Sequence, residues 1–545
     1  MTTLHHTPDL FALSEIRGPV LRPGDDGYAE EVTGFNLAAL HTPDVVVGAT
    51  GADDVVAALR WATATGTPVA VQATGHGANF PMDHGLLIST RRMTGVRVDP
   101  ERGTATVAAG ARWRDVLAAA APHGLAGLCG TSTNVGAVGY TVGGGLPLLG
   151  RAHGYAADLI RSFHVVTPDG TLHETGPDRE PDLFRALRGG KHAVGVVTSM
   201  VTELLPLRTL LGGGLWFPGE HAEAVLSAWC GWIRTVPEQM CTSFALLRLP
   251  PIPQIPEALR GGFWARVAVA WTGDPAEGEE WLAPVRAAAP VAVDAVEEMP
   301  YTDLDRVCME PQDPLPVRES CLLLHELTPV AVRTFLDQVG PDVPDCPLLL
   351  TELRHMGGAL SRPAHTPDAI CARDAAHLLQ SVAVVATPPD AEAVERATAA
   401  LHTAMSPYGT GRTMVNIHGT PGGPADRARA WTPEVHDDLR RLKDTYDPDG
   451  LLRFGHTPQP RRPRHAHAPV PDNSLVSARA GRGRRLHGKG PPCDCAVPCS
   501  TTSRTSPPRS PTGAPYGTGW TSPPSPSTSP PRTNWRRPWR TSTSS

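Results

Sequence analysis

A histidine stands between two glycines at the end of a short apolar run in the first part of the chain. Residues 68–77 read Pro-Val-Ala-Val-Gln-Ala-Thr-Gly-His-Gly, so that His76 is flanked by Gly75 and Gly77. Glycine adopts a positive φ without steric cost, and successive backbone N–H groups in such a loop converge on an anion. The pattern predicts a loop that holds a diphosphate, with His76 at its rim.

A second glycine-rich run follows further along the chain. Residues 135–145 read Val-Gly-Ala-Val-Gly-Tyr-Thr-Val-Gly-Gly-Gly. They lack the spacing of the dinucleotide-binding fingerprint and its acidic residue about 20 positions downstream. Two interpretations are open for this run. It is either a flexible turn or a second loop whose amide groups contact the same diphosphate.

Several segments together resemble the flavin domain of the berberine-bridge-enzyme-like FAD-linked oxidases, which have the PCMH-type or vanillyl-alcohol-oxidase-type FAD-binding fold. They are the apolar run 45–47, the Gly-His loop, the glycine-rich run, the stretches 182–190 and 195–198, and the run Tyr-Asp-Pro-Asp-Gly-Leu-Leu-Arg-Phe at 446–454. The resemblance implies that the cofactor is FAD.

In the resembled family, the histidine of the Gly-His loop forms a covalent bond from its imidazole to the 8α carbon of the flavin. The resemblance therefore implies a covalent bond between His76 and FAD. Some members add a second bond from a cysteine placed just before a Val-Gly pair. When Val135 and Gly136 are matched to that pair, Ser132 takes the cysteine's place and Cys129 lies three residues earlier. We therefore expect a single attachment, through His76.

The resemblance also implies which residues contact FAD. The usual Gly-Asn-Phe of the family is replaced by residues 192–194, His-Ala-Val. Backbone contacts expected just after that point depend little on side chains and survive the change. The expected cofactor-binding residues are Gln72, Ala73, Thr74, Gly75, His76, Gly77, Ala78, Ser132, Val135, Gly136, Gly139, Tyr140, Gly143, Val196 and Val197.

The catalytic base is not specified by a matching motif. Many family members use a tyrosine from a Tyr-x-Asn-Tyr strand, but residues 414–418 read Met-Val-Asn-Ile-His, and both tyrosines are absent. His418 is one candidate, because imidazole titrates near neutral pH and suits general base catalysis. The alternative is that His418 only caps the strand.

Two further residues are candidates for the base. Residues 351–359 resemble the family strand that leads to Leu-Gly-Gly-Ala over the flavin, and alternation along a strand puts Glu352 and Arg354 on one face. Glu352 is either a base or half of a structural ion pair with Arg354. Tyr140, at the flavin end of the glycine-rich run, is the third candidate.

The elements expected to position these residues alternate between strands and helices. Residues 45–47 and 69–72 read as strands around a helix that opens with a capping box at Thr50-Gly-Ala-Asp53. Further strands are expected at 85–90, 104–109 and 159–167, with a hairpin turn at 168–170 and an amphipathic helix around 113–120. Mixed elements with hairpins predict an α+β fold rather than a doubly wound parallel sheet.

From residue 208 onward the segments lengthen, which indicates a second domain with a sheet covered by helices. We expect residues 1–42 to pack on the flavin domain, 43–207 to bind FAD, 208–410 to bind substrate and 411–459 to return to the flavin domain. Helices are expected at 222–233, 275–289, 328–339, 391–405 and 433–445, and strands at 242–249, 263–271, 348–353, 378–386 and 412–417.

The composition narrows the classes of binding partner to consider. The 49 basic and 55 acidic residues give a net charge of −6, which does not favour nucleic acid or an anionic membrane surface as a partner.

No signal peptide pattern or membrane-spanning apolar run is present, so we expect a cytoplasmic protein. Cysteine spacing matches neither a disulfide framework nor a zinc site in the first 460 residues, and we expect no metal. Residues 460–545 are rich in Pro, Ser, Thr and Arg, and we expect them to be disordered.

These expectations combine into one function. The chain is expected to be a two-domain FAD-dependent oxidase that transfers a hydride to flavin N5. The hydride comes from an alcohol or a reduced ring of a small molecule, such as a specialised metabolite or a sugar. Dioxygen then reoxidises the flavin and releases hydrogen peroxide. The alternatives are a dehydrogenase with another electron acceptor and a flavin-binding protein without catalysis. No motif in the sequence specifies the substrate or the oligomeric state.

Overall fold

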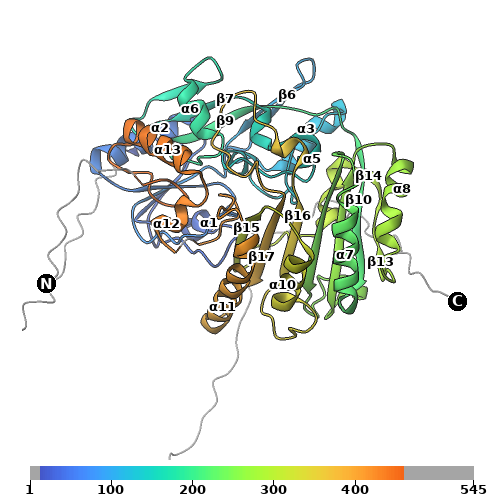
Figure 1. The fold of residues 1–545 in the computed structure, drawn as a ribbon. Coiled ribbons are helices and arrows are strands. Elements are labelled where there is room, and N and C mark those ends of the chain that lie inside the picture. Colours follow the sequence, from blue (N-terminus) through green and yellow to red (C-terminus); the bar gives the residue numbers. More distant parts are fainter. Residues whose placement is uncertain (1–12, 421, 460–545) are drawn as a thin grey trace, which may run out of the picture. The chain divides into compact units, whose positions relative to one another are not determined.

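A computed structural model of the chain describes residues 13–420 and 422–459. Within these residues the strands form three sheets, and helices pack around them (Figure 1). The predicted α+β class is confirmed. The expectation for residues 460–545 lies outside the described residues. None of the helices in the described ranges has the length and apolar character needed to span a bilayer.

The first sheet has the strand order β1-β2-β4-β3. Strands β2, β4 and β3 are parallel, and β1 pairs with β2 in the antiparallel sense. Helix α2 connects β2 to β3, as a parallel pair requires. The elements of this part are β1 (Val20–Leu21), α1 (Tyr28–Val32), β2 (Val45–Gly48), α2 (Ala52–Thr65), β3 (Val69–Gln72) and β4 (Leu86–Ser89).

The start of α2 differs from the predicted capping box. Asp54, rather than Asp53, accepts hydrogen bonds from the Thr50 backbone N–H at 2.8 Å and from its hydroxyl at 2.7 Å. Asp54 also accepts a bond from the Arg17 N–H at 2.8 Å. The prediction was wrong by one residue because the helix begins after Gly51, at Ala52.

The second sheet is antiparallel, with the order β5-β6-β9-β7-β8. The predicted turn at 168–170 joins β7 to β8, and the helix predicted around 113–120 buries the expected apolar face against this sheet. Its elements are β5 (Val96–Asp99), β6 (Thr104–Ala108), α3 (Trp113–Ala120), α4 (Ala137–Thr141), α5 (Gly150–His153), β7 (Ile160–Val166), β8 (Leu172–Thr175), α6 (Pro181–Leu187) and β9 (Val196–Glu203).

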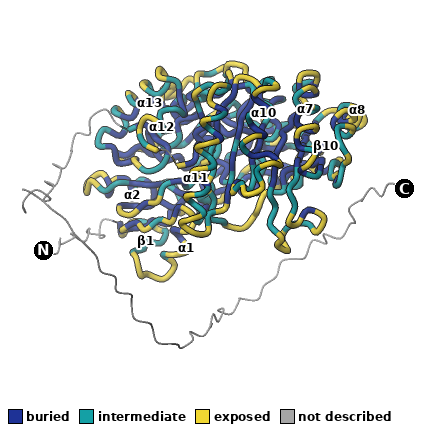
Figure 2. Tube along the Cα trace, turned by 60° about the horizontal axis from the view of Figure 1, so that its bottom comes forward, coloured by how far each residue is buried: buried dark blue, intermediate teal, exposed yellow. Residues whose placement is uncertain are grey.

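The third sheet is the largest and is antiparallel throughout, with the order β13-β10-β12-β11-β16-β17-β15 and β14 beside β10. Four helices, α7, α8, α10 and α11, cover one face and bury a continuous apolar core against it (Figures 1 and 2). The strands are β10 (Thr209–Pro218), β11 (Met240–Arg248), β12 (Phe263–Trp271), β13 (Val293–Asp294), β14 (Glu297–Pro300), β15 (Val317–Leu324), β16 (Leu350–His355) and β17 (His377–Val384). The helices are α7 (Ala222–Trp232), α8 (Pro275–Arg286), α9 (Asp305–Cys308), α10 (Pro329–Val339) and α11 (Pro388–Met405).

Strand β10 was not predicted, because three consecutive glycines interrupt its apolar pattern. Gly213 has φ +146°, and a Cβ at this residue would lie 2.1 Å from the Ala295 carbonyl oxygen. The missing side chain lets the segment between β13 and β14 approach β10 closely. Glycine inside a strand often marks such a close approach.

The predicted strand at 412–417 was wrong. Residues 415–417 form a turn, and the Ile417 N–H donates to the Met414 carbonyl at 3.0 Å. The segment still follows the edge strand β15, since the Leu323 N–H donates to the Arg412 carbonyl at 3.1 Å. This one backbone bond is too few to form a strand, so the segment remains a loop beside the sheet.

The last described segment returns to the first sheet. It contains α12 (Pro424–Ala428) and α13 (Pro433–Tyr446). The Val69 N–H of β3 donates to the Leu451 carbonyl at 2.8 Å. Lys443 and Asp447 form a fully buried ion pair at 2.8 Å, and the Lys443 ammonium also donates to the Leu452 carbonyl. This pair ties the end of α13 to the run at 446–454.

Candidate cofactor and active site

A cavity of about 1180 Å³ lies between the loops that follow β3, the glycine-rich run and the third sheet. This volume is above the range of about 300–1,000 Å³ that is usual for a small-molecule site. The cavity therefore has room for a large cofactor together with a substrate.

The Gly-His loop, residues 73–78, forms part of the cavity wall directly after β3. Gly75 has φ +71°, and a Cβ there would lie 2.5 Å from the Gly34 Cα. The Phe35 N–H donates to the Thr74 carbonyl at 2.8 Å, which joins the two backbones at this crossing. Glycine is therefore required both for the left-handed conformation and for the close approach of the N-terminal segment.

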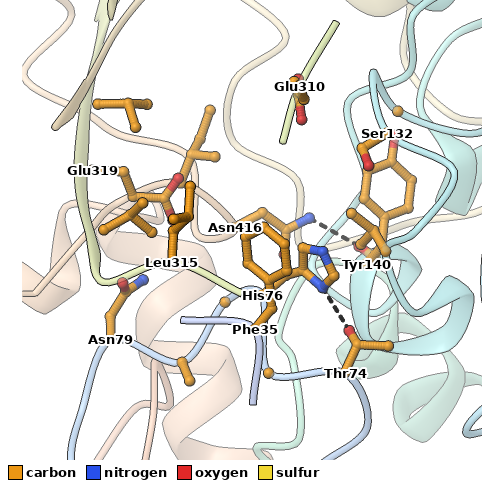
Figure 3. A pocket seen from close by; sticks show the side chains of 18 of the residues that line it. Phe35, Thr74, His76, Asn79, Ser132, Tyr140, Glu310, Leu315, Glu319 and Asn416 are labelled. Carbon is orange, nitrogen blue, oxygen red and sulfur yellow. Dashed lines mark hydrogen bonds between the residues drawn. The ribbon is translucent and has the colours of Figure 1, made fainter. Parts of the chain in front are cut away.

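His76 is held between an aromatic ring and a hydroxyl group. Its ring stacks on Phe35 with centroids 4.0 Å apart, and its Nδ1 lies 2.9 Å from the Thr74 hydroxyl (Figure 3). Its Nε2 is buried and has no hydrogen-bond partner in the part of the chain that the structure describes. Burial, and then the charge of Arg112, lower the pKa of His76 to about 4. The imidazole is neutral at physiological pH, and one nitrogen is free to react.

The glycine-rich run meets the Gly-His loop through one hydrogen bond. The Gly136 N–H donates to the Thr74 hydroxyl at 3.2 Å, so Thr74 contacts both His76 and the start of α4. A Cβ at Gly77 or at Gly139 would meet no atom of the described residues within 4 Å. Both glycines line the cavity, and an incoming ligand can approach their backbones closely.

Gly143 serves a different contact. A Cβ there would lie 2.0 Å from the Asn416 Oδ1, so only glycine lets Asn416 pack against this turn. The Asn416 Nδ2 donates to the Tyr140 carbonyl at 2.9 Å, and the Lys191 ammonium donates to the Asn416 Oδ1. This network connects the loop beside β15 to the glycine-rich run.

The structure brings most of the predicted cofactor-binding residues to one cavity. Gly143 is the exception, because its space is filled by Asn416. The predicted residues that line the cavity are Gln72, Ala73, Thr74, Gly75, His76, Gly77, Ala78, Ser132, Val135, Gly136, Gly139, Tyr140, Val196 and Val197. Contact of each residue with FAD stays a prediction.

Tyr140, one of the three predicted catalytic residues, lines the cavity and packs edge-on against Trp113 with centroids 5.8 Å apart. Its hydroxyl is buried without a hydrogen-bond partner among the described residues. Burial raises the pKa of Tyr140 well above its usual value. The hydroxyl therefore stays protonated and can donate a hydrogen bond to a ligand.

Glu352 also lines the cavity, but it is fixed in an ion-pair network. Its carboxylate lies 2.9 Å from Arg354 and 3.5 Å from Arg266, and it accepts a hydrogen bond from the Ser243 hydroxyl at 2.7 Å. Burial alone would raise the pKa of Glu352, but the two guanidinium groups and the hydroxyl outweigh it and hold the pKa below its usual value. This arrangement supports the alternative interpretation, a structural ion pair.

His418 lies outside the described lining of the cavity. It is buried; its Nδ1 is 2.6 Å from the Thr413 hydroxyl and its Nε2 is 3.2 Å from the Asp426 carboxylate. The turn at 415–417 replaces the predicted strand, and His418 holds this loop to α12 through Asp426. The role of His418 as the base stays a prediction.

Cys129 likewise lies outside the described cavity lining, whereas Ser132 is part of it. The Cys129 thiol is buried 3.9 Å from the Tyr301 hydroxyl, and burial raises its pKa to about 12. A protonated thiol that faces the core is not placed to bond a ligand in the cavity.

Three ionisable residues that line the cavity were missed as site residues: Glu310, Glu319 and Lys191. Glu319 lies on β15 and Glu310 in the loop before it, and Lys191 precedes β9. Lys191 has φ +58°, a strained conformation for a residue with a side chain. The one sequence signal was Glu319 itself, a carboxylate within the apolar strand Val-Arg-Glu-Ser-Cys-Leu-Leu-Leu.

The site fits a flavin dinucleotide. Two glycine turns expose backbone to a large cavity, and the His76 Nε2, the Gln72 Oε1 and the Tyr140 hydroxyl are buried polar atoms without a partner in the described residues. Buried polar groups in proteins are almost always paired, so these atoms indicate a bound group. The fold and the site together define a dinucleotide-binding flavoprotein.

Comparisons with known proteins support this class. Residues 43–176 match the family model described as FAD binding domain. The uncharacterized FAD-linked oxidoreductase YgaK of Bacillus subtilis is 26% identical over 466 residues, which cover 82% of this chain and 98% of that protein.

Two solved structures share the fold. 6-Hydroxy-D-nicotine oxidase from Arthrobacter nicotinovorans superposes with a TM-score of 0.70 at 22% identity, over 82% of this chain and 98% of its own. The wild-type berberine-bridge-enzyme-like protein 1 of Physcomitrella patens superposes with a TM-score of 0.70 at 17% identity, over 83% of this chain and 99% of its own.

The chain therefore contains an FAD-binding domain and has the PCMH-type fold of the berberine-bridge-enzyme-like flavoproteins. The expected resemblance is confirmed, and so is the expectation of an FAD-linked oxidoreductase, through the similarity to proteins of that class.

Proposed function

We propose that this protein is an FAD-dependent oxidase with the cofactor attached covalently to His76. Its substrate is a small molecule with an alcohol or a reduced ring, such as a specialised metabolite or a sugar. Residues 43–207 and 411–459 would bind FAD, and residues 208–410 would bind the substrate. The similarity to 6-hydroxy-D-nicotine oxidase supports the oxidase assignment.

The observation that carries this proposal is the position of Thr74. Its hydroxyl accepts from the Gly136 N–H and lies beside the His76 Nδ1, so it joins the two glycine loops around one cavity. The same contact fixes the His76 ring and leaves the buried Nε2 without a partner among the described residues. A neutral imidazole held in this way is suited to bond a cofactor.

When bound, FAD would accept a hydride from the substrate and pass both electrons to dioxygen, which yields hydrogen peroxide. The chain's own residues bind the cofactor and orient the groups around it. The two glycine turns present backbone to the cofactor, Phe35 and Thr74 hold the His76 ring, and the Tyr140 hydroxyl offers a hydrogen bond to a ligand. The charged residues Glu319 of β15 and Glu352 and Arg354 of β16 also line the cavity.

The test is an absorbance spectrum of the purified protein followed by acid precipitation. We expect flavin absorbance that stays in the pellet of the wild-type protein and leaves the pellet of His76→Ala. A Thr74→Val variant is the matched control, because it removes the hydroxyl that positions His76 but keeps the imidazole. We expect it to retain less acid-stable flavin than wild type and more than His76→Ala.

Catalysis is tested with a panel of secondary alcohols, oligosaccharides and reduced nitrogen heterocycles. The proposal expects at least one compound to bleach the flavin anaerobically and to give hydrogen peroxide in air. Bleaching without rapid reoxidation by air would assign a dehydrogenase instead. A colourless protein that takes up no FAD on refolding would contradict the proposed function.

A further inference from the structure

Three carboxylates line the described cavity, and they differ in their partners. Glu352 is fixed by two arginines, as described above. Glu310 and Glu319 have no basic group within 4.0 Å in the ion pairs of the described residues. A general base must be able to release and accept a proton near neutral pH, and a carboxylate locked between two guanidinium groups cannot do so. Glu310 and Glu319 are the remaining choices.

Glu319 is placed on a rigid element and faces the cofactor side. It lies on β15, paired with β17 along its length, and its side chain is half-buried. Figure 3 shows Glu319 and Asn79 at the same end of the cavity, and the buried Asn79 Nδ2 has no hydrogen-bond partner among the described residues. Catalytic groups on strands are held more precisely than those on loops.

The residues around Glu319 belong to the loops that form the cofactor side. Asn79 directly follows the Gly-His loop, and its carbonyl accepts a bond from the Thr420 hydroxyl at 3.0 Å. Lys191 donates to the Gly139 carbonyl at 3.5 Å and to Asn416. A Cβ at Gly419 would lie 2.0 Å from the Glu319 carbonyl oxygen, so that turn packs directly on β15. The backbone at Glu319 therefore packs on the 416–420 loop. Asn416 of that loop contacts the glycine-rich run, and Thr420 contacts the residue that follows the Gly-His loop.

We propose that Glu319 is the general base of the oxidation, with Asn79 and Lys191 in the same cavity wall. This proposal rests on the proposed function. The substrate O–H bond breaks and its proton goes to a Glu319 carboxylate oxygen, while the carbon's hydrogen leaves with its electron pair to FAD and the C–O bond becomes C=O. The proton on Glu319 and the two electrons with the transferred hydrogen then convert dioxygen to hydrogen peroxide, which restores the carboxylate.

The titration of Glu319 agrees with this role. Burial raises the pKa of Glu319 to about 7, and Glu310 adds to the rise, while the nearby Asn79 amide and the Lys191 charge oppose it. Burial lowers the pKa of Lys191 to about 8, so the ammonium is charged where the carboxylate forms. The carboxylate form becomes dominant as the pH rises through about 7. The rate of substrate oxidation should rise over the same pH range.

Glu310 has a different setting. It lies on the loop before β15, and burial raises its pKa while the Thr131 hydroxyl and the Arg354 charge oppose the rise. Glu310→Gln is the comparison variant. Because the Glu310 charge raises the pKa of Glu319, this variant should keep the acid limb and move it to lower pH.

The experiment measures flavin reduction by anaerobic stopped-flow, from pH 5 to 9, with any panel compound that bleaches the wild-type flavin. We expect Glu319→Gln to slow reduction by about 10²–10⁴-fold and to lose the acid limb of the pH profile. Glu319→Asp should regain part of the rate of flavin reduction together with the acid limb of the pH profile. Flavin content and acid-stable flavin of all variants should equal wild type, since Glu319 does not hold the cofactor.

Lys191→Met tests the effect of the nearby positive charge separately. Removing the positive charge should move the acid limb to higher pH, because Lys191 lowers the pKa of Glu319. A full rate and an unchanged limb in Glu319→Gln would overturn the proposal and leave the oxidase assignment intact. A wild-type flavin that no panel compound reduces would overturn the assignment and this proposal together.

Discussion

On one side of the cavity the wall is backbone, turned at Gly75 and Gly136 and joined by the Thr74 hydroxyl. On the other side the wall is formed by side chains of the third sheet, and it includes the charged residues Glu319, Glu352 and Arg354. The cofactor side depends on close approach of backbones, whereas the charged part of the sheet side depends on ion pairing. The two sides should therefore respond to different changes.

The largest effect is expected from a side chain at the backbone crossing. Gly75→Ala places a methyl group 2.5 Å from the Gly34 Cα and forces alanine into φ +71°. Strain and overpacking together should cost about 2–6 kcal/mol and abolish FAD incorporation. Chemical denaturation and flavin content of the purified protein measure both effects.

Gly77→Ala is the matched control for this comparison. Its Cβ would meet no described atom within 4 Å, so the free energy of unfolding without cofactor should stay within about 1 kcal/mol of wild type. FAD uptake should still weaken, because the methyl group points into the cavity. Equal destabilisation by both variants would contradict the distinction between a fold glycine and a cofactor glycine.

On the sheet side, the next largest effect is expected from Glu352→Gln. It leaves Arg266 and Arg354 without their common carboxylate, and breaking a buried pair in this way costs about 3–5 kcal/mol. Urea denaturation should show the loss. Glu238→Gln, which breaks an exposed pair with Arg362, should change stability by less than about 1 kcal/mol. A similar small effect for both would show that the sheet side does not depend on its charges.

Acid should act on the cofactor side through its histidines. Burial lowers the pKa of His192 to about 4, and its Nε2 donates to the Phe454 carbonyl at 2.7 Å. Between pH 4 and 6.5 the unfolded chain binds a proton at His192 that the folded chain does not, so stability should rise with pH across this window. Across this window the free energy of unfolding should rise by about 3 kcal/mol. Thermal unfolding of His192→Gln should show a shallower pH dependence, and an unchanged slope would contradict the assignment.

The smallest effect is expected from replacement of the buried Cys129 thiol. Cys129 is buried away from the cavity lining that the structure describes, so Cys129→Ala should leave the acid-stable flavin at the wild-type level. The lost packing should cost about 1 kcal/mol in the free energy of unfolding. Loss of acid-stable flavin in this variant would place a second attachment on the cofactor side.

The sequence predicted the cofactor side better than the sheet side, and the reason is physical. Gly75, His76 and Gly136 lie in short local motifs, where the glycine pattern itself determines the backbone. Glu319 reaches the site only because β15 pairs with β17 and the loop at 410–420 packs beside it, contacts that no local pattern encodes.

The errors have the same origin. The strand predicted at 412–417 followed an apolar pattern, but the chain turns at 415–417, where Asn416 packs against Gly143. Strand β10 was missed because its glycines are required by the neighbouring segment at Ala295 rather than by a turn. In both cases a tertiary contact overrode the local preference.

Peptide mass spectrometry of the purified protein tests the central claim most directly, which is that the two glycine loops hold one FAD bonded to His76. We predict that the proteolytic peptide containing residues 68–77 carries the mass of one FAD, with fragmentation that assigns the bond to His76. An unmodified peptide would contradict the bond to His76, and a protein that also contains no dissociable flavin would contradict the shared FAD site.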